Sequence, residues 1–336
     1  MDPHDLKAFF EQLKLDGLLT GDEYQYEALT GGVSSEIYRV TSGGRVFVVK
    51  RALEQLKVAA DWEADLSRNL YEVRYLKYVS AIEPSAVPKV LHEGDGYFAM
   101  EYLGGEFKTW KADLLNGILD AVVAERLGAI VGRIHARSHS QSAVRDQFQS
   151  LDNFKQLRIS PYIDHLKDKH PQIAENLKRA SLCLASCSNC LVHGDLSPKN
   201  ILVGPERIVL LDCEVAWFGD PAFDLAFLVN HLCLKALYHA PHYVETRPLI
   251  ERFLTSYFQE RVLSESSREA LESRTAFLLA LLLLARADGK SPVEYLEDSK
   301  FDVIRAFSVP RIAESAGDLN SLLDDWFDKV ESLCQQ

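Results

Sequence analysis

The chain has 336 residues, of which 47% are hydrophobic and 26% are charged, as in an ordinary globular protein with a substantial core. Its net charge of -12 argues against nonspecific binding to nucleic acid or to an anionic membrane. The longest apolar run, residues 276–285, is too short to span a bilayer. The N-terminus lacks the pattern of a signal peptide, so we expect a reduced, cytoplasmic protein.

The first hundred residues predict a small antiparallel sheet. Residues 5–19 have the apolar spacing of a short amphipathic helix, and residues 62–79 have that of a long one. Alternating or β-branched runs bounded by turn residues predict five strands, at residues 26–29, 36–41, 45–50, 87–92 and 97–102. We therefore expect an N-terminal domain over residues 1–103.

The remainder of the chain, residues 104–336, predicts a mostly helical second domain. It begins at Gly104–Gly105, a plausible hinge. Helical periodicity covers 121–138, and 161–184 predicts further helix broken at Pro171. Beyond Pro221 the pattern is helical to the end of the sequence. The whole chain thus predicts an α+β fold.

The most informative stretch runs from His193 through Gly194 and Asp195 to Asn200, with Asp212 twelve residues later. Short apolar runs that read as buried strands lie between these polar residues. A carboxylate at the end of a buried strand must find a cation or a proton. Phosphoryl transfer uses such a set: one Asp orients a hydroxyl, while an Asn and a second Asp hold Mg²⁺ on the nucleotide.

The motif H-G-D-x4-N resembles the H-R-D-x4-N catalytic loop of protein kinases. It resembles more closely the loop of the aminoglycoside phosphotransferase and choline kinase families. This resemblance implies a bilobal, protein-kinase-like fold with a small antiparallel β lobe and a larger helical lobe. It also implies ATP- and Mg²⁺-dependent transfer to a hydroxyl of a small molecule such as a sugar, an amino alcohol or an aminoglycoside. In this interpretation Asp195 is the catalytic base, and Asn200 and Asp212 bind the metal.

Residues near the loop have two interpretations each. Lys199 could reach the transferred phosphate or be a solvated lysine. Glu214, in a D-x-E segment that resembles methylthioribose kinase, could bind a second metal or be a surface acid. Asp224 resembles the helix-start Asp that braces the loop, although an acid at a helix N-terminus is also favoured by the dipole. His193 is expected to anchor the loop within the core.

The same resemblance places nucleotide-binding groups in the N-terminal lobe. Lys50 ends a strand and would contact the phosphates, paired with Glu72 on the following helix; Glu63 is the rival partner. Met100, Glu101 and Leu103 would line or bind the adenine. The loop over the phosphates would be formed by the small residues Gly31, Gly32, Ser34 and Ser35.

The acceptor site is expected in the helical lobe, from segments 154–162 and 285–292. Methylthioribose kinases place paired arginines near the second segment, whereas this chain has the single Arg286. A protein kinase is a weaker interpretation, because the loop from Cys213 to Pro221 is short and no A-P-E segment follows it. A catalytically inactive nucleotide-binding protein is the third. The acceptor, the choice between ATP and GTP, and the oligomeric state stay open.

Overall fold

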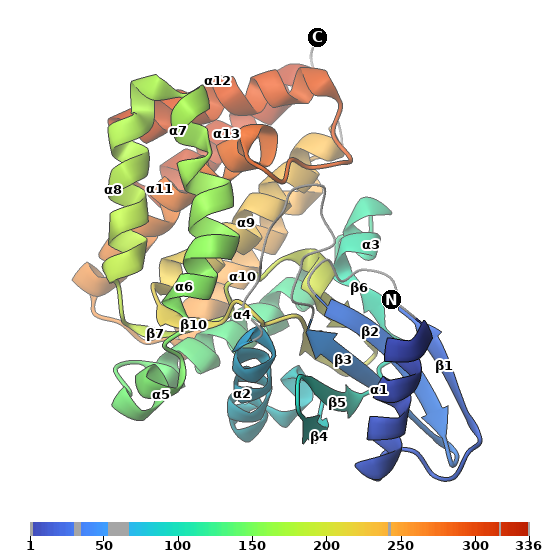
Figure 1. The fold of residues 1–336 in the computed structure, drawn as a ribbon. Coiled ribbons are helices and arrows are strands. Elements are labelled where there is room, and N and C mark those ends of the chain that lie inside the picture. The colour runs from blue at the N-terminus through green and yellow to red at the C-terminus, as the bar shows by residue number, and fades with distance from the viewer. Residues whose placement is uncertain (1–2, 30–34, 53–66, 241–242, 316, 335–336) are drawn as a thin grey trace. The chain divides into compact units, whose positions relative to one another are not determined.

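The computed structural model describes residues 3–29, 35–52, 67–240, 243–315 and 317–334. The chain divides into two compact units, Met1–Glu106 and Phe107–Gln336 (Figure 1). The predicted boundary lay three residues earlier, after Leu103. Gly105, just before the junction, has a positive φ of 69° that a residue with a side chain rarely adopts.

The N-terminal unit contains an antiparallel sheet with the strand order β1-β2-β3-β5-β4. Its strands are β1 (Tyr24–Ala28), β2 (Ser35–Ser42), β3 (Arg45–Ala52), β4 (Val90–Gly94) and β5 (Tyr97–Glu101). Successive side chains along each strand point to opposite faces of the sheet. This lets side chains such as Tyr38, Val40 and Val49 enter a common core. The prediction of five antiparallel strands is confirmed.

Two helices belong to this unit. Helix α1 (Pro3–Leu15) packs Phe9, Phe10 and Leu13 into the core of the sheet. It ends earlier than predicted because Gly17 has a φ of 73°, and the Leu18 N–H turns back to the Leu13 carbonyl at 3.0 Å. Helix α2 (Ser67–Ile82) corresponds to the predicted long helix, whose expected first residues, 62–66, lie outside the described residues.

The C-terminal unit is mostly helical. Its longer helices are α4 (Ala121–Ser138), α8 (Ala174–Ser186), α9 (Pro221–Tyr238), α10 (Arg247–Glu260), α11 (Glu265–Asp288), α12 (Asp298–Glu314) and α13 (Leu319–Cys334). Helix α9 is apolar around most of its circumference and packs against α11, so it forms the centre of this unit. Helix α4 packs against α10 at Gly128, where an added Cβ would lie 2.2 Å from the Phe253 carbonyl oxygen.

Shorter elements complete the unit. The helical ones are α3 (Trp110–Leu115), α5 (Ser142–Gln147), α6 (Leu151–Phe154), η2 (Lys155–Asp164), α7 (Leu166–Lys169), η3 (Pro171–Ile173), η4 (Pro198–Asn200) and η5 (Tyr243–Thr246). The strands are β6 (Lys108–Thr109), β7 (Cys190–Val192), β8 (Ile201–Val203), β9 (Ile208–Leu210) and β10 (Trp217–Gly219). They form a β10-β7 pair and a β6-β8-β9 sheet. Within the described part of the chain, no helix combines the length and the apolar character that crossing a bilayer demands.

Candidate active site

The predicted catalytic loop connects β7 to η4 and requires glycine at its second position. Gly194 has a φ of 78°, in the left-handed region. A Cβ on this residue would also lie 2.6 Å from the Val215 carbonyl oxygen. The backbone therefore passes too close to its neighbour for any side chain, which explains the H-G-D form of the motif here.

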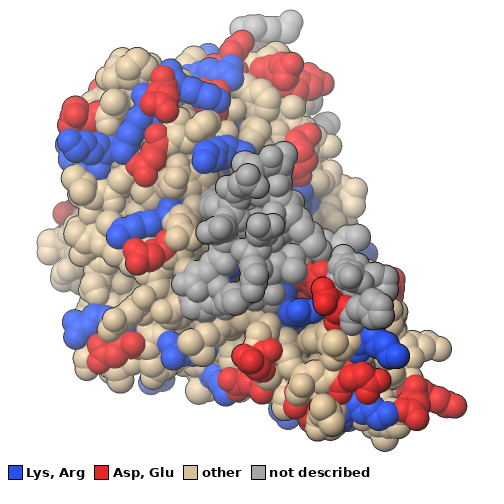
Figure 2. Space-filling view, in the orientation of Figure 1, with Lys and Arg blue, Asp and Glu red and all other residues tan. Residues whose placement is uncertain are grey.

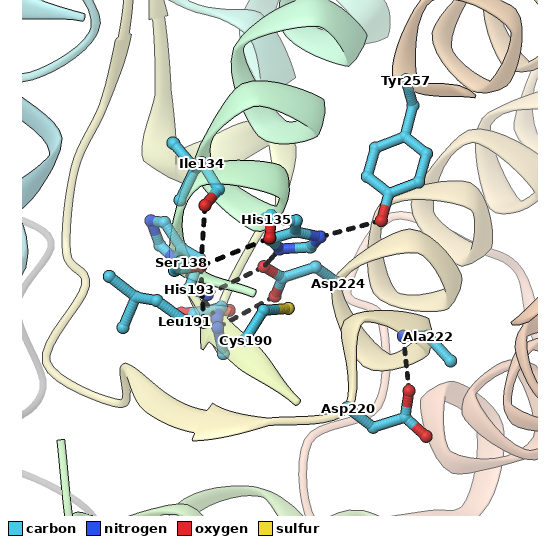
Figure 3. A network of polar contacts seen from close by, with 12 residues as sticks. Ile134, His135, Ser138, Cys190, Leu191, His193, Asp220, Ala222, Asp224 and Tyr257 are labelled. Atoms are coloured by element: carbon cyan, nitrogen blue, oxygen red, sulfur yellow. Dashed lines mark hydrogen bonds and ion pairs between the residues drawn. The ribbon is translucent and has the colours of Figure 1, made fainter. Parts of the chain in front are cut away.

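Asp224, in the first turn of α9, holds the start of this loop (Figure 3). The His193 N–H donates to Asp224 Oδ2 at 2.8 Å, and the Gly194 N–H donates to Asp224 Oδ1 at 3.0 Å. The expectation that Asp224 braces the loop backbone is confirmed. The stiff attachment fixes the position of the next residue, Asp195.

His135 of α4 completes the brace, although no motif or spacing in the sequence singles it out. Its Nε2 lies 3.2 Å from Asp224 Oδ2, and its Nδ1 lies 3.0 Å from the Tyr257 hydroxyl (Figure 3). Burial lowers the pKa of His135 and outweighs the opposing effect of Asp224. A neutral ring can donate from Nε2 to Asp224 and accept at Nδ1 from Tyr257. Three elements are thus joined through one carboxylate.

His193 is buried and anchors the loop, as expected. Its Nδ1 accepts a hydrogen bond from the Asp195 N–H at 3.2 Å. Burial lowers the pKa of His193, so its ring is neutral and able to accept at Nδ1. This bond orients the backbone that carries the Asp195 carboxylate.

Three donors converge on one oxygen of Asp195. Its Oδ2 lies 2.8 Å from Asn200 Nδ2, 3.0 Å from a terminal nitrogen of Arg158 and 3.4 Å from Lys199 Nζ. Its Oδ1 has no hydrogen bond with any residue that the structure describes. Burial would raise the pKa of Asp195, but Arg158 and Lys199 hold it well below the ordinary value. The group is an ionised carboxylate whose Oδ1 can accept a hydrogen bond from a hydroxyl.

Arg158 was not predicted as a partner of Asp195. It belongs to η2, a π-helix that includes Pro161, and its Nε donates to the Gly194 carbonyl at 2.6 Å. The guanidinium therefore contacts both the backbone and the carboxylate of the loop. Segment 154–162 was expected to form the acceptor site, but no spacing rule connects one of its residues with a loop some 40 positions later.

Strand pairing brings the two predicted metal-binding positions together. In the antiparallel pair of β8 and β9, Ile201 lies opposite Leu210, and the Leu211 N–H donates to the Asn200 carbonyl at 2.8 Å. Asp212 follows directly, with a φ of 58° that is rare for a non-glycine residue. Its carboxylate has an oxygen within 4.8 Å of one from the largely buried Glu214.

In the N-terminal unit, Lys50 and Glu72 form the predicted pair. Lys50 Nζ lies 2.7 Å from Glu72 Oε2, and the two side chains are 3% and 2% exposed. The rival partner, Glu63, lies outside the described residues. Lys50 lies within β3, which continues to Ala52 rather than ending at Lys50 as expected, and the buried pair holds its ammonium in one place.

Only some of the other predicted nucleotide-binding residues belong to the part of the chain that the structure describes. Gly31, Gly32 and Ser34 lie outside the described residues, whereas Ser35 is the buried first residue of β2. Met100 and Glu101 end β5, where Met100 lies opposite both Val48 and Val90. Leu103 follows that strand, and the Glu101 N–H donates to the Lys89 carbonyl at 2.9 Å. Their contact with a nucleotide stays a prediction.

Arg286 lies at the end of α11, in the second segment expected to form the acceptor site. One terminal nitrogen of Arg286 contacts the Ser291 carbonyl and lies 3.1 Å from the Ser291 hydroxyl. The side chain is largely buried. It is thus held at its tip by the loop that follows the helix.

Comparison with known proteins gives a match to a family model and to methylthioribose kinases. The model of the phosphotransferase enzyme family matches residues 25–261. Methylthioribose kinase of Exiguobacterium sibiricum is 22% identical over 255 residues, which cover 67% of this chain and 65% of that protein. Methylthioribose kinase of Geobacillus kaustophilus is 25% identical over 235 residues, covering 61% and 58% respectively. The chain therefore spans less than two thirds of the length of these relatives.

Two solved structures share the fold at low sequence identity. Amicoumacin kinase hAmiN in complex with AMP-PNP, Ca²⁺ and Ami has a TM-score of 0.57 and 16% identity, covering 96% of this chain and all (100%) of that one. Choline kinase of Cryptosporidium parvum has a TM-score of 0.55 and 13% identity, covering 98% and 100%. The predicted protein-kinase-like fold is confirmed. With its family model matching well over half of the sequence, the chain belongs to the phosphotransferase enzyme family, as its H-G-D-x4-N loop predicted.

Proposed function

We propose that this protein is an ATP- and Mg²⁺-dependent kinase that phosphorylates a hydroxyl of a small molecule. In the reaction a bond forms between the acceptor oxygen and the γ-phosphorus, and the bond from that phosphorus to ADP breaks. The hydroxyl proton passes to Asp195. The names of the relatives, methylthioribose kinase and amicoumacin kinase, support a small-molecule acceptor.

The arrangement around Asp195 is the observation that carries this proposal. Asn200, Arg158 and Lys199 all contact Oδ2, so the carboxylate is fixed in orientation while Oδ1 stays available among the described residues. A hydroxyl that donates to Oδ1 would have its oxygen aimed by that bond. The depressed pKa of Asp195 makes it a weak base. Phosphoryl transfer tolerates this, because the loose transition state depends mainly on positioning and charge neutralisation.

The residues at the ends of β8 and β9 suit a hard divalent cation. The Asn200 Nδ2 is used by Asp195, which leaves the amide oxygen as its ligand atom. Asp212 supplies a carboxylate, and Glu214 a further one. Oxygen ligands of this kind are preferred by Mg²⁺. When bound, the ion would neutralise charge on the phosphates of the nucleotide.

The remaining predicted residues would bind the nucleotide. Lys50, held by Glu72, would contact its α- and β-phosphates. Ser35, together with Gly31, Gly32 and Ser34, would cover the phosphates, and Met100, Glu101 and Leu103 would contact the base. Lys199 lies 3.4 Å from Asp195 Oδ2, close enough to the carboxylate to neutralise charge on the transferred phosphoryl group.

An ATP-consumption screen with mass detection of product tests the proposal. The panel comprises sugars, amino alcohols, hydroxy acids and aminoglycosides, with generic peptides as the arm for a protein kinase. We expect a small-molecule product that carries one added phosphoryl group. Asp195→Asn should lower kcat by about 10²- to 10⁴-fold, the range for a positioned proton acceptor, and leave the affinity for Mg-ATP unchanged.

Lys178→Met is the matched control, because Lys178 is exposed on α8 and forms no hydrogen bond or ion pair with the described residues. This variant should retain full turnover. Unchanged turnover in Asp195→Asn would contradict the role of Asp195. Stabilisation of the protein by Mg-ATP without transfer to any acceptor would instead favour an inactive nucleotide-binding protein.

A further inference from the structure

One face of α9 leads away from the catalytic loop. Asp224, Phe227, His231 and Lys235 are spaced three or four residues apart, so their side chains lie along one side of the helix. Phe227 is linked to the site by Arg158, whose guanidinium carbon lies 5.6 Å from the centre of the Phe227 ring. At about 1.5 Å per residue, Lys235 lies roughly 12 Å beyond Phe227 along the helix axis.

Lys235 is a buried cation without a carboxylate partner. Its side chain is 1% exposed, and its Nζ lies 3.6 Å from the centre of the Tyr295 ring. It has no hydrogen bond or ion pair with any other residue that the structure describes. A buried charge left unpaired is strongly unfavourable, so Lys235 either gives up its proton or binds an anion that stabilises its charged form.

Other polar groups near Lys235 also lack some of their hydrogen-bond or ion-pair partners among the described residues. Arg286 contacts Ser291, which is neutral, and has no ion pair in the described part of the chain. Its buried Nε and the buried Tyr295 hydroxyl lack hydrogen-bond partners among the described residues. The nearby Glu294 is occupied, because it pairs with Lys111 of α3. Lys235 and Arg286 are therefore two basic groups that form no ion pair with a carboxylate of the described structure, although Glu294 acts on both at longer range.

Electrostatics supports the same grouping. Burial, with Lys111 and Arg286, lowers the pKa of Lys235 to about 7 against the opposing effect of Glu294. Burial lowers the pKa of His231 as well, and Arg286, Lys235 and the catalytic-loop residue Lys199 add to this effect. The surface facing the viewer in Figure 2, by contrast, intersperses basic and acidic side chains. The basic groups that act on Lys235 and His231 include Arg286, and those that act on His231 include Lys199 of the catalytic loop.

We infer that the acceptor carries an anionic group, a carboxylate or a phosphate, which binds Lys235 and Arg286 while its hydroxyl faces Asp195. The inference rests on the proposed kinase activity and narrows its acceptor class. An anion would form charge-assisted hydrogen bonds with both basic groups and stabilise their charged forms. The separation along α9 indicates an acceptor several bonds long between its anionic group and the reacting hydroxyl.

Matched acceptors test this inference. One set holds a sugar frame nearly constant and varies charge: glucose, glucosamine, gluconate and glucose 6-phosphate. The last two distinguish a carboxylate from a phosphate. Turnover is measured by ATP consumption and product mass, and binding by thermal stabilisation without nucleotide. Both are measured for the wild type, for Lys235→Met and for the exposed-lysine control Lys178→Met. Methionine preserves the length of the buried lysine, so folding should be retained.

We expect an anionic member to be preferred over glucose, and Lys235→Met to lower kcat/KM for it by about 10- to 100-fold, the effect of one charged hydrogen bond. The decrease should appear as a higher KM for the acceptor. The KM for ATP and the activity of the control should be unchanged. If glucose or glucosamine is phosphorylated equally by the wild type and Lys235→Met, the kinase proposal stands and the anion site is wrong.

If no compound is phosphorylated, but gluconate or glucose 6-phosphate stabilises the wild type and not Lys235→Met, the anion site stands and the kinase proposal fails. If neither anion stabilises the wild type more than it stabilises Lys235→Met, and no anionic acceptor is preferred, the inference is overturned.

Discussion

Arg158 and Asp195 form an ion pair at the centre of the site, with a terminal nitrogen of the guanidinium 3.0 Å from Asp195 Oδ2. The same guanidinium donates through Nε to the Gly194 carbonyl at 2.6 Å. Arg158 therefore fixes the loop at two neighbouring points. Because it contacts Oδ2, it restrains the carboxylate without occupying Oδ1, the oxygen assigned to the acceptor hydroxyl.

Replacing Arg158 should move the acid limb of the pH–activity profile. Arg158 and Lys199 hold the pKa of Asp195 below its usual range against the effect of burial. In Arg158→Met this pKa should rise, so Asp195 becomes protonated at a higher pH and activity is lost earlier on acidification. The measurement is kcat/KM from pH 4 to 8. Arg158→Lys retains a charge and should shift the limb less; an acid limb that stays in place in Arg158→Met would contradict the pairing.

Gly194→Ala should be more damaging than an alanine at another left-handed glycine. Gly194 and Gly117 have φ values of 78° and 74°, but only at Gly194 would a Cβ meet the backbone, 2.6 Å from the Val215 carbonyl oxygen. Gly117→Ala should lower the free energy of unfolding by about 1–2 kcal/mol, the cost of a left-handed alanine. Gly194→Ala should cost more and also lower kcat. Denaturant unfolding of both variants checks this, and equal losses would exclude the steric contact.

Asp224→Asn should loosen the catalytic loop. The carboxylate accepts from the N–H groups of His193 and Gly194 with separate oxygens, and an amide can accept with only one. One buried N–H would lose its partner, which should lower the free energy of unfolding by about 1–3 kcal/mol. Asp120→Asn is the control, because Asp120 caps α4 through the Val122 N–H at 2.8 Å without an ion pair in the described part of the chain, and asparagine caps equally well. A larger loss in the control would contradict the brace.

Local signals in the sequence were sufficient to predict the site residues that lie at strand ends or on one face of a helix. Asn200 and Asp212 follow from the apolar runs beside them, and Glu72 follows from the helical face it shares with Leu76 and Val79. Arg158 could not be predicted in the same way. It reaches the loop from a π-helix far away in the sequence, and only the packing of the whole unit brings them together.

Lys235 was missed for a different reason. The surrounding sequence of α9 is almost entirely apolar, so its periodicity predicts a buried helix and gives a lone lysine no distinct meaning. Its isolation from carboxylates depends on α3, α11 and the segment at Tyr295, which meet only in the folded chain. His135 was overlooked similarly, because its partners Asp224 and Tyr257 belong to two other helices.

Lys235→Met should stabilise the protein most at neutral and lower pH. Burial, with Lys111 and Arg286, lowers the pKa of Lys235 to about 7, whereas the unfolded chain has the ordinary value of 10.5. Between these values the unfolded state binds the extra proton, so wild-type stability rises with pH by about 1.4 kcal/mol per unit from this group. Below pH 7 the full penalty of the buried charge applies.

The advantage of Lys235→Met should therefore be largest at pH 6 to 7 and shrink toward pH 10. Urea unfolding of the wild type, Lys235→Met and Lys178→Met across this range, without added anions, measures it. The Lys178→Met control removes a charge that is already solvated, so its stability should parallel the wild type at every pH. Glu294, Lys111, Arg286, His231 and Tyr295 also face or act on Lys235, and all five are present in the three proteins. A constant difference between wild type and Lys235→Met would mean that Lys235 keeps its proton in the folded protein through a counterion already present.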